Sequence, residues 1–278
     1  MRAIVEVKWG PMRGHKVTLL PGSTLTVGRT ERCNLVLEHD RDMSASHFVI
    51  SWDGADCRVR DAGSIRGTLV NGAPAAEASI ANGGWIRAGN TVFMVYLEAA
   101  TPPRRGADTT MSPEKQRALA CLRDEQPTLY ALLDAAKGPR ILELVRESVA
   151  DCRSLFDGVR GEALSEVAPY LVRLLPESGL LERLIAEGWG KRWGVYLTSQ
   201  AELVQLRRHL RRFLMVHDEE TQRRVYFRYY DPPVLDALLG CATVRQRGQL
   251  FAMITSFWFE RPGAEPVRVD LSGERQVA

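Results

Sequence analysis

The sequence predicts two domains, an N-terminal antiparallel β-sandwich and a C-terminal α/β domain in which helices surround a mainly parallel sheet. The chain has 278 residues, which is more than most single hydrophobic cores accommodate. In the N-terminal third, turn signals recur roughly every dozen residues between strand-like segments. From residue 129 onward, apolar strand-like runs alternate with helical patterns, which is typical of a parallel sheet with crossover helices.

The N-terminal strands are expected to have one face in water. Residues 4–7, 16–19 and 57–60 alternate apolar and polar side chains, a period of two that favours half-buried strands. The turn signals between the strands are Pro21-Gly22, Asp53-Gly54, Asn71-Gly72 and Asn82-Gly83-Gly84. We therefore expect residues 1–98 to form the sandwich.

Three motifs beside predicted strands make this sandwich more specific. They are Gly28-Arg29 after strand 25–27, Ser44-Ala45-Ser46-His47 before strand 48–50, and residues 67–72 after residues 61–64. In order and spacing they resemble the forkhead-associated (FHA) domain, a phosphothreonine-reading sandwich, over about residues 1–98. Phosphate binding needs a fixed guanidinium and short hydroxyl donors. The resemblance implies that Arg29 and Ser44 contact the phosphate, and that His47 braces the loop.

The sequence departs from the FHA pattern at Ala45, Ile65 and Arg66, where the family has ligand contacts, although Arg66 adds a cation. Two interpretations stay open: phosphopeptide binding, or a retained fold used as a plain docking module. The candidate phosphopeptide-binding residues are Arg29, Ser44, Arg66, Thr68 and Asn71. The last two are expected to shape loops, with Asn71-Gly72 forming a hairpin.

Residues 99–126 are expected to form a linker and a linker helix. The first part is rich in Pro, Arg, Gly and Thr, so little of it can be buried. Ser112 then precedes Pro113 at a first helical position, which predicts a capped helix that runs toward Arg123.

The C-terminal domain is expected to span residues 127–262. Its predicted strands are residues 129–133, 169–174, 193–197, 225–230 and 250–258. Its predicted helices cover residues 141–149 and 178–186, and two more begin after Ser199 and after Asp231. Ser178, Ser199 and Asp231 are expected N-caps, and Glu202 would complete a capping box with Ser199. The charged residues 263–278 are expected to form a loose tail.

Residues 226–233 read Tyr-Phe-Arg-Tyr-Tyr-Asp-Pro-Pro, where the strand 225–230 is expected to break into a helix. From local chemistry alone this is a core strand-helix unit. The run also resembles the central motif of the type VI secretion effector-adaptor family (Tap or Tec proteins), over about residues 127–260. The resemblance implies a cytoplasmic chaperone whose partners are a type VI effector and the VgrG spike.

Arg207, Arg208, Arg211 and Arg212 share one predicted helix, with pairs at i,i+4. They form either a solvated face or a basic groove for an acidic segment of a partner. On strand 225–230, alternation would place Tyr226, Arg228 and Tyr230 on one face. Arg228 would then be either a brace on an internal carboxylate or part of the effector groove. The effector-binding candidates are Arg207, Arg211, Tyr226, Arg228 and Tyr230.

The sequence indicates no enzyme, since it has no nucleophile elbow, zinc-protease motif, phosphate loop or dinucleotide fingerprint. The five cysteines lack metal-ligand spacing, so we expect reduced thiols, no metal and no cofactor. A net charge of +3 does not argue for nucleic acid, and no run is apolar enough to span a membrane. The expected role is a cytoplasmic effector adaptor with an FHA domain; the alternative is a phosphorylation-dependent signalling or scaffold module that regulates type VI secretion.

Overall fold

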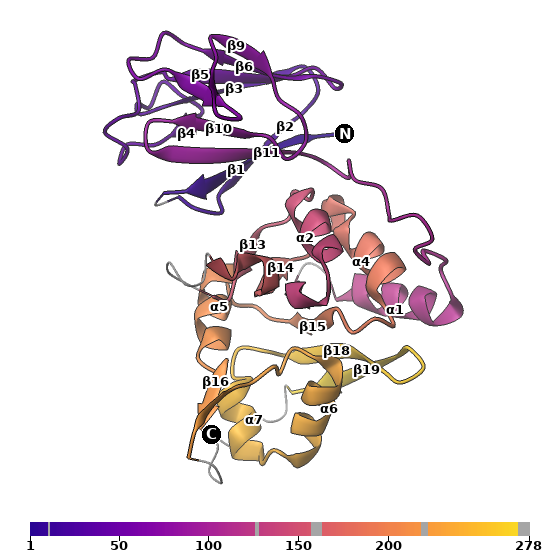
Figure 1. Cartoon of the computed structure of the whole chain (residues 1–278). Helices are drawn as coiled ribbons and strands as arrows, with labels where there is room; N and C mark the ends of the chain where they lie inside the picture. Colours follow the sequence, from indigo (N-terminus) through magenta and orange to yellow (C-terminus); the bar gives the residue numbers. More distant parts are fainter. Residues whose placement is uncertain (11, 126–127, 157–162, 218–221, 272–278) are drawn as a thin grey trace. The chain divides into compact units, whose positions relative to one another are not determined.

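The computed structural model describes residues 1–10, 12–125, 128–156, 163–217 and 222–271 (Figure 1). The chain divides into two compact units. The first comprises Met1–Pro102 with Arg146–Val149, and the second comprises Pro103–Val145 with Ala150–Ala278. Within the described part of the chain, no helix has the length and apolar composition needed to cross a membrane.

The first unit is a sandwich of two sheets, as predicted. One sheet has the order β2 (Lys16–Leu19), β1 (Ala3–Trp9), β11 (Thr91–Leu97), β10 (Trp85–Ala88), β7 (Thr68–Val70) and β8 (Ala73–Pro74). The other has the order β4 (Leu35–Val36), β3 (Ser23–Gly28), β5 (Phe48–Trp52), β6 (Cys57–Asp61) and β9 (Glu77–Ser79). Every pair is antiparallel except β3 with β4.

Alternation along the strands builds the sandwich core. In β5, Phe48, Ile50 and Trp52 are buried while the residues between them are half-exposed. Phe48 packs edge-on against Phe93 of β11, with ring centroids 5.3 Å apart, so the two sheets meet at this pair. The expected hairpin forms between β7 and β8, where Asn71 and Gly72 both have positive φ, as a two-residue turn of this kind requires.

The second unit contains a six-stranded sheet. Its order is β13 (Cys152–Ser154), β14 (Pro169–Arg173), β12 (Leu129–Asp134), β15 (Gly194–Thr198), β18 (Ser256–Arg261) and β19 (Glu265–Asp270). All neighbouring pairs are antiparallel, so the prediction of a mainly parallel sheet is wrong.

The error has a topological cause. Strands β14 and β15 both run antiparallel to β12, so they point the same way, and helix α4 (Leu180–Gly188) joins them as a crossover. Strand β12 lies between them, however, and breaks the parallel contact. Strands β12 and β13 repeat this arrangement, with helix α2 (Pro139–Arg146) as the crossover and β14 between them. The alternation of strands and helices correctly predicted that the strands joined by a helix run in the same direction. It wrongly predicted that these strands are neighbours in the sheet.

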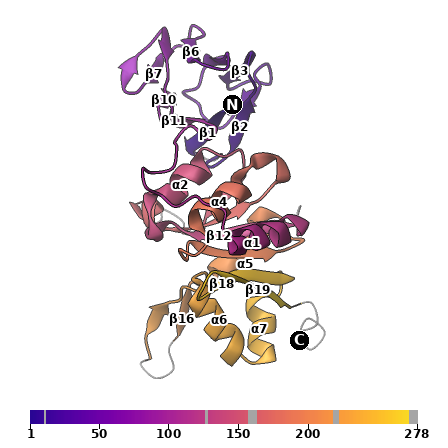
Figure 2. The same cartoon turned by 90° about the vertical axis from the view of Figure 1, so that its right-hand side faces the viewer.

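Helices cover both faces of this sheet. Figure 2 shows α1 (Pro113–Asp124), α2 and α4 on one side, and α6 (Pro232–Cys241) and α7 (Val244–Leu250) on the other. Alternate residues of β12 follow this division: Leu129, Ala131 and Leu133 pack with the first group, and Tyr130 and Leu132 with the second. Helix α5 (Leu203–Arg211) adds Leu206 and Leu210 to the second core.

The segment 225–230 does not form a strand of the large sheet, contrary to the prediction. Only β17 (Arg224–Tyr226) is extended, and it pairs with β16 (Met215–His217) in a separate two-stranded ribbon. The chain then turns, so Tyr229 and Tyr230 are both buried and do not alternate. The large aromatic side chains correctly indicated burial. The buried residues, however, lie in a turn that leads into α6 and not in a strand.

Two further predictions at the C-terminal end are wrong. Residues 250–258 are not one strand, because α7 ends at Leu250 and β18 begins at Ser256. The expected tail contains β19, which pairs with β18 along its whole length. Its outer position explains the missed signal, since an edge strand exposes polar residues and tolerates Pro266. Residues 272–278 of the expected tail lie outside the described residues.

The predicted helix starts are correct in part. Ser112 caps α1 and accepts a hydrogen bond from the Lys115 N–H. By contrast, α4 and α5 begin after Gly179 and Glu202, so Ser178 and Ser199 are not their caps. The Ser199 hydroxyl instead donates to the Met253 carbonyl at 2.6 Å. The Ser199 oxygen still accepts locally, from the Ala201 N–H at 3.1 Å, but this turn precedes α5 and does not cap it.

Candidate peptide-binding site and adaptor surface

Three loops meet at one end of the sandwich, after β3, before β5 and between β6 and β7. The backbone N–H of Arg29 donates to the Ser44 carbonyl at 3.0 Å, which joins the first two loops. The close approach depends on Gly28, because a Cβ there would lie 2.4 Å from the Ala45 carbonyl oxygen. The structure therefore brings together Arg29 and Ser44, two of the candidate site residues.

His47 connects the second loop to the third. Its Nδ1 accepts from the Ser44 N–H at 3.0 Å, so Nε2 carries the ring proton and donates to the Gly67 carbonyl at 3.1 Å. The ring is fully buried. His47 is thus a brace inside the loops, in agreement with the role that the FHA resemblance implied.

Asp61 shapes the third loop. Its carboxylate accepts from the N–H groups of Gly63 and Ser64, both at 2.8 Å, and from the hydroxyls of Ser64 and Thr68, both at 2.6 Å. Burial would raise the pKa of Asp61, but these hydrogen bonds outweigh it and hold the pKa below its usual value. Thr68 is buried, so it shapes the loop from inside.

The Ser44 hydroxyl is positioned to donate outward. Its Oγ accepts from the Ile65 N–H at 3.0 Å, which leaves the hydroxyl proton available for a ligand. Ile65 itself is 92% exposed and offers only an apolar side chain. Ala45 is exposed as well, so neither altered position supplies a polar group beside Ser44.

Arg29 supplies a free cation at this end. Its side chain is exposed, and within the described residues nothing forms a hydrogen bond or an ion pair with its guanidinium. A guanidinium without an internal partner remains available for an anion. Arg66, the other candidate cation, already pairs with Asp42 at 3.0 Å while its side chain stays 67% exposed.

A hollow of about 330 Å³ lies beside Arg66. Two residues that the sequence analysis missed, Arg87 and Asn90, help to line it together with Asp42. Asn90 Nδ2 donates to the Asp42 carboxylate at 2.9 Å. In the sequence, Gly89 was the available signal, because it indicates a turn between β10 and β11. In the structure this turn packs tightly against Asp40. Asn71, by contrast, lies at the opposite end of β7 from Arg66, where its Oδ1 accepts from the Trp85 N–H at 2.9 Å.

In the second unit, Arg228, Tyr226 and Tyr230 come together around a carboxylate that the sequence analysis missed. Arg228 Nη1 lies 3.8 Å from Asp134 Oδ2, and the hydroxyls of Tyr226 and Tyr230 are 3.0 Å apart. Asp134 is the last residue of the otherwise apolar strand β12, which was the available signal in the sequence. Tyr230 is buried, and burial raises its pKa. Tyr226 is 38% exposed and the Arg228 side chain is 52% exposed, so these two are the accessible members of the group.

Arg207 and Arg211 lie on α5 but do not form an open groove. Arg207 Nε donates to the Ser154 carbonyl at 2.6 Å, and Nη2 donates to the Phe156 carbonyl at 3.2 Å. These bonds hold the helix against the end of β13. Arg211 is half-buried in the last turn of α5. The exposed members of the arginine group are Arg208 and Arg212.

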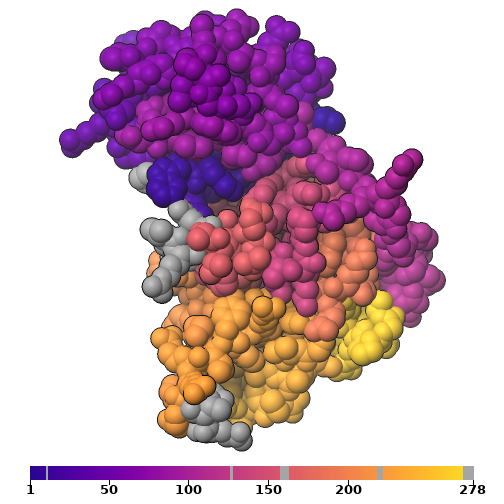
Figure 3. All heavy atoms as spheres, in the orientation of Figure 1, coloured from indigo at the N-terminus to yellow at the C-terminus, as the bar shows by residue number. Residues whose placement is uncertain are grey.

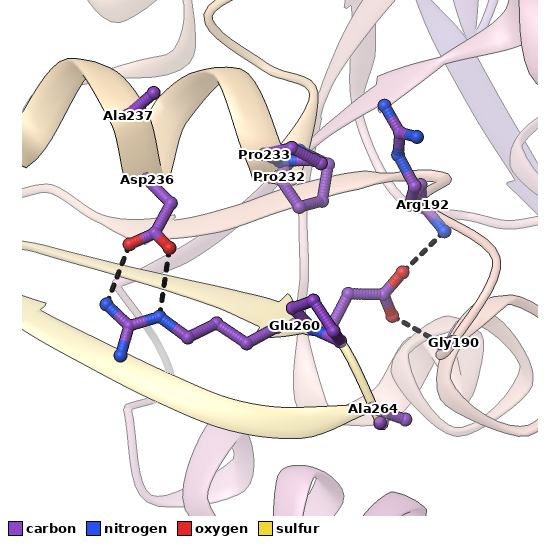
Figure 4. Close-up of a pocket in the computed structure, with 11 residues that line it drawn as sticks. Gly190, Arg192, Pro232, Pro233, Asp236, Ala237, Glu260 and Ala264 are labelled. Atoms are coloured by element: carbon purple, nitrogen blue, oxygen red, sulfur yellow. Dashed lines mark hydrogen bonds and ion pairs between the residues drawn. The ribbon is translucent and has the colours of Figure 1, made fainter.

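A second hollow, of about 530 Å³, lies between the start of α6 and the β18–β19 hairpin (Figure 4). Asp231 stands at the expected N-cap position of α6, but its carboxylate binds Arg192, at 3.0 and 2.6 Å, in place of the helix N–H groups. Arg261 similarly binds Asp236 at 3.0 and 2.7 Å. Both guanidinium groups of this hollow are therefore neutralised from within the unit.

Glu260 forms the floor of the same hollow. It accepts hydrogen bonds from the backbone N–H groups of Gly190 and Arg192 (Figure 4). Burial nevertheless raises the pKa of this carboxyl above its usual value. The arrangement fixes the loop before β15 to β18, which is a structural task. Within the described residues, no group of three or more His, Cys, Asp or Glu is placed to hold a metal ion.

Two protein-family models match the chain. Residues 129–249 match a family described as a domain of unknown function, DUF4123. Residues 6–99 match a family described as the inner membrane component of T3SS, cytoplasmic domain. The second match lies within the first unit, and the DUF4123 match lies in the second unit except for residues 146–149.

Curated relatives match between about a quarter and a third of the chain. An FHA domain-containing protein of Arabidopsis thaliana is 40% identical over 68 residues, which cover 24% of this chain and 17% of the relative. FhaA of Mycobacterium tuberculosis is 35% identical over 84 residues, which cover 30% of this chain and 16% of FhaA. The glycogen accumulation regulator GarA of Mycolicibacterium smegmatis is 34% identical over 87 residues, which cover 31% of this chain and 54% of GarA. The chain thus spans between about a sixth and just over half of these relatives' lengths.

Solved structures give a similar match. An FHA domain from a structural and functional analysis of phosphothreonine-dependent FHA interactions is 29% identical and has a TM-score of 0.32. The match covers 37% of this chain and 100% of that one.

Proposed function

Because the chain carries an FHA domain followed by a DUF4123 domain, the domain of the type VI secretion effector adaptors, we propose that it binds a type VI effector and helps to load it onto the VgrG spike. The pairing of the two domains in one chain is the observation that carries the proposal. Such an adaptor works in the bacterial cytoplasm and catalyses no reaction. It needs no metal or cofactor.

The FHA domain would recognise a phosphothreonine segment of a partner. Support comes from the free guanidinium of Arg29 and from the Ser44 hydroxyl, whose proton is available for a ligand. A phosphate in reach of both would receive one charge-assisted contact and one hydroxyl hydrogen bond. Arg66 adds a second cation at the same end, although Asp42 partly neutralises it. These few contacts predict weak binding.

The experiment is co-purification of the tagged full-length chain with the effector and the spike protein encoded beside it. We expect the effector to remain bound through gel filtration and the spike to join only when the effector is present. Purification of the chain with neither protein, under conditions where both are folded, would contradict the adaptor role.

A second function is supported by the free Arg29 alone. In it, the chain is a phosphorylation-dependent scaffold that regulates secretion, and the second unit holds a signalling partner. The two functions differ in the effect of phosphatase. Effector capture by an adaptor persists after treatment of the mixture with phosphatase, whereas assembly of a signalling scaffold is lost.

A further inference from the structure

The two-stranded ribbon β16–β17 presents a mixed apolar and cationic face. Its register places Met215 opposite Tyr226 and His217 opposite Arg224. Directly opposite residues, and residues two apart on one strand, share a face of a ribbon. These four side chains therefore lie together, and all four are exposed. We name them the ribbon face.

Arg208 of α5 and Arg212, which follows the last residue of α5, extend the positive charge beside the ribbon face. Arg208 and Arg212 are one helical turn apart, so they project from the same side, and both are exposed. Arg212 precedes Met215 by three residues, so their Cα atoms lie within roughly 11 Å. In the described residues, the guanidinium groups of Arg208, Arg212 and Arg224 have neither hydrogen bonds nor ion pairs. Helix α5 and the described ribbon residues, 215–217 and 222–226, contain no acidic residue.

The ribbon is anchored to the rest of its unit. The Phe227 N–H donates to the Leu214 carbonyl at 2.9 Å, and the Tyr229 hydroxyl donates to the Leu210 carbonyl at 2.9 Å. The ring of Tyr226 packs edge-on against Phe156, with centroids 5.9 Å apart. The backbone of the ribbon is therefore anchored, so binding of a partner would mainly order the exposed side chains. In Figure 3 this orange segment lies at the molecular surface.

We propose that the ribbon face, with Arg208 and Arg212, docks an acidic segment of a protein partner that also carries apolar side chains. The inference rests on the proposed adaptor function and assigns the surface and chemistry by which the effector is held. Arginines that have no carboxylate partner among the described residues favour an acidic ligand, and Met215 and the ring of Tyr226 favour apolar or aromatic side chains between the carboxylates. A nucleic acid would use the cations but would leave Met215 without a partner.

The test selects peptides from a random display library on the immobilised full-length chain. We expect the selected peptides to be rich in Asp and Glu around an aromatic or aliphatic residue. In a fluorescence anisotropy titration, Arg212→Glu with Arg224→Glu is expected to weaken binding of such a peptide about tenfold or more, because attraction becomes repulsion. Added salt should weaken wild-type binding more than binding by the double variant.

The control is Arg245→Glu. Arg245 lies on α7 of the same unit, is exposed and has no hydrogen-bond or ion-pair partner in the described residues, so Arg245→Glu is the control for either single reversal, Arg212→Glu or Arg224→Glu, at another place. Peptides without acidic enrichment, or equal weakening by the control, would overturn the proposal. So would a short single-stranded DNA that binds through Arg212 and Arg224 while acidic peptides do not.

The effector itself separates this inference from the adaptor role. If the effector co-purifies equally with the wild type and the folded double variant, the adaptor role stands and the ribbon proposal is wrong. If no effector binds the wild type while acidic peptides do and lose affinity in the double variant, the adaptor role fails and the docking surface stands.

Discussion

The Nη1 atom of Arg228 lies 3.8 Å from Oδ2 of Asp134, a buried carboxylate oxygen that accepts no hydrogen bond within the described residues. Asp134 is 1% exposed, whereas the side chain of Arg228 is 52% exposed. Burial raises the pKa of Asp134, although the Ala136 N–H and the cations of Arg228 and Lys137 act in the opposite direction. A solvent-facing arginine thus partly compensates a carboxylate in the interior.

Arg228→Ala is expected to lower the free energy of unfolding at neutral pH by about 1 kcal/mol. This loss of about 1 kcal/mol lies between the small stabilisation that an exposed ion pair provides and the larger cost of leaving a buried charge unpaired. Urea unfolding followed by circular dichroism measures it, with Arg245→Ala as the control for loss of an exposed arginine. Unchanged stability together with weaker effector capture would show that Arg228 acts in the interface instead of as a brace.

Asp134→Asn is expected to stabilise the protein at neutral pH. The raised pKa means that the folded state binds the Asp134 proton more tightly than the unfolded state does. The stability that this proton provides is fully present below the usual pKa of 3.8 and is lost as pH rises through the folded-state value. Asparagine keeps the oxygen that accepts from the Ala136 N–H and removes the charge.

Urea unfolding at several pH values between 3.5 and 7 tests this. The advantage of Asp134→Asn should grow as pH rises and be smallest at the acidic end. An advantage that shrank with rising pH would mean that the ionised carboxylate stabilises the fold.

Local patterns predicted the sandwich because its determinants are local. The period of two in β6 reports which side chains face the core, and Asn71-Gly72 forces a hairpin by its positive φ values. The bracing role of His47 followed from the FHA resemblance, since one of its two partners, the Gly67 carbonyl, lies 20 residues away and no local pattern shows it. The cap at Ser112 depends on a backbone N–H three residues away.

The remaining features depend on contacts between distant parts of the chain. No local pattern shows that β12 separates β14 from β15, because the order of strands in a sheet depends on contacts between segments that are far apart in sequence. The pairing of Arg192 with Asp231 joins residues that are 39 apart in sequence, and nothing in the sequence around either residue predicts its partner. The aromatic run 226–230 favoured a strand, yet burial of Tyr229 and Tyr230 is satisfied by a turn.

Arg29→Ala is expected to abolish measurable phosphothreonine binding and to leave the fold intact. The guanidinium makes no internal hydrogen bond or ion pair in the described residues, so its loss removes nothing from the folded chain. One charge-assisted contact is worth about 1.5–3 kcal/mol, which equals roughly ten- to a hundredfold in affinity. Isothermal titration with phosphothreonine peptides provides the measurement, and Arg58→Ala, on the exposed side of β6, is the control. Binding that survived Arg29→Ala would exclude this end of the sandwich as the phosphate site.

Gly28→Ala is expected to weaken phosphothreonine binding although Arg29 is still present. The added Cβ would lie 2.4 Å from the Ala45 carbonyl oxygen and 2.7 Å from Cys33 Sγ, so the loops that carry Arg29 and Ser44 must move apart. Overpacking of this kind costs about 1–3 kcal/mol of stability. The matched control is Gly240→Ala on α6, where a Cβ meets nothing within 4 Å, and which should be neutral or slightly stabilising.

Thermal unfolding and peptide titration of both glycine variants separate two explanations. Lower stability with unchanged affinity would mean that the loops relax together and that the spacing of Arg29 and Ser44 does not set phosphate binding. Lost affinity in Gly28→Ala, at a temperature where the variant is fully folded, would show that binding depends on this spacing. The free guanidinium of Arg29 would then be necessary but not sufficient, because the Ser44 hydroxyl must stand beside it.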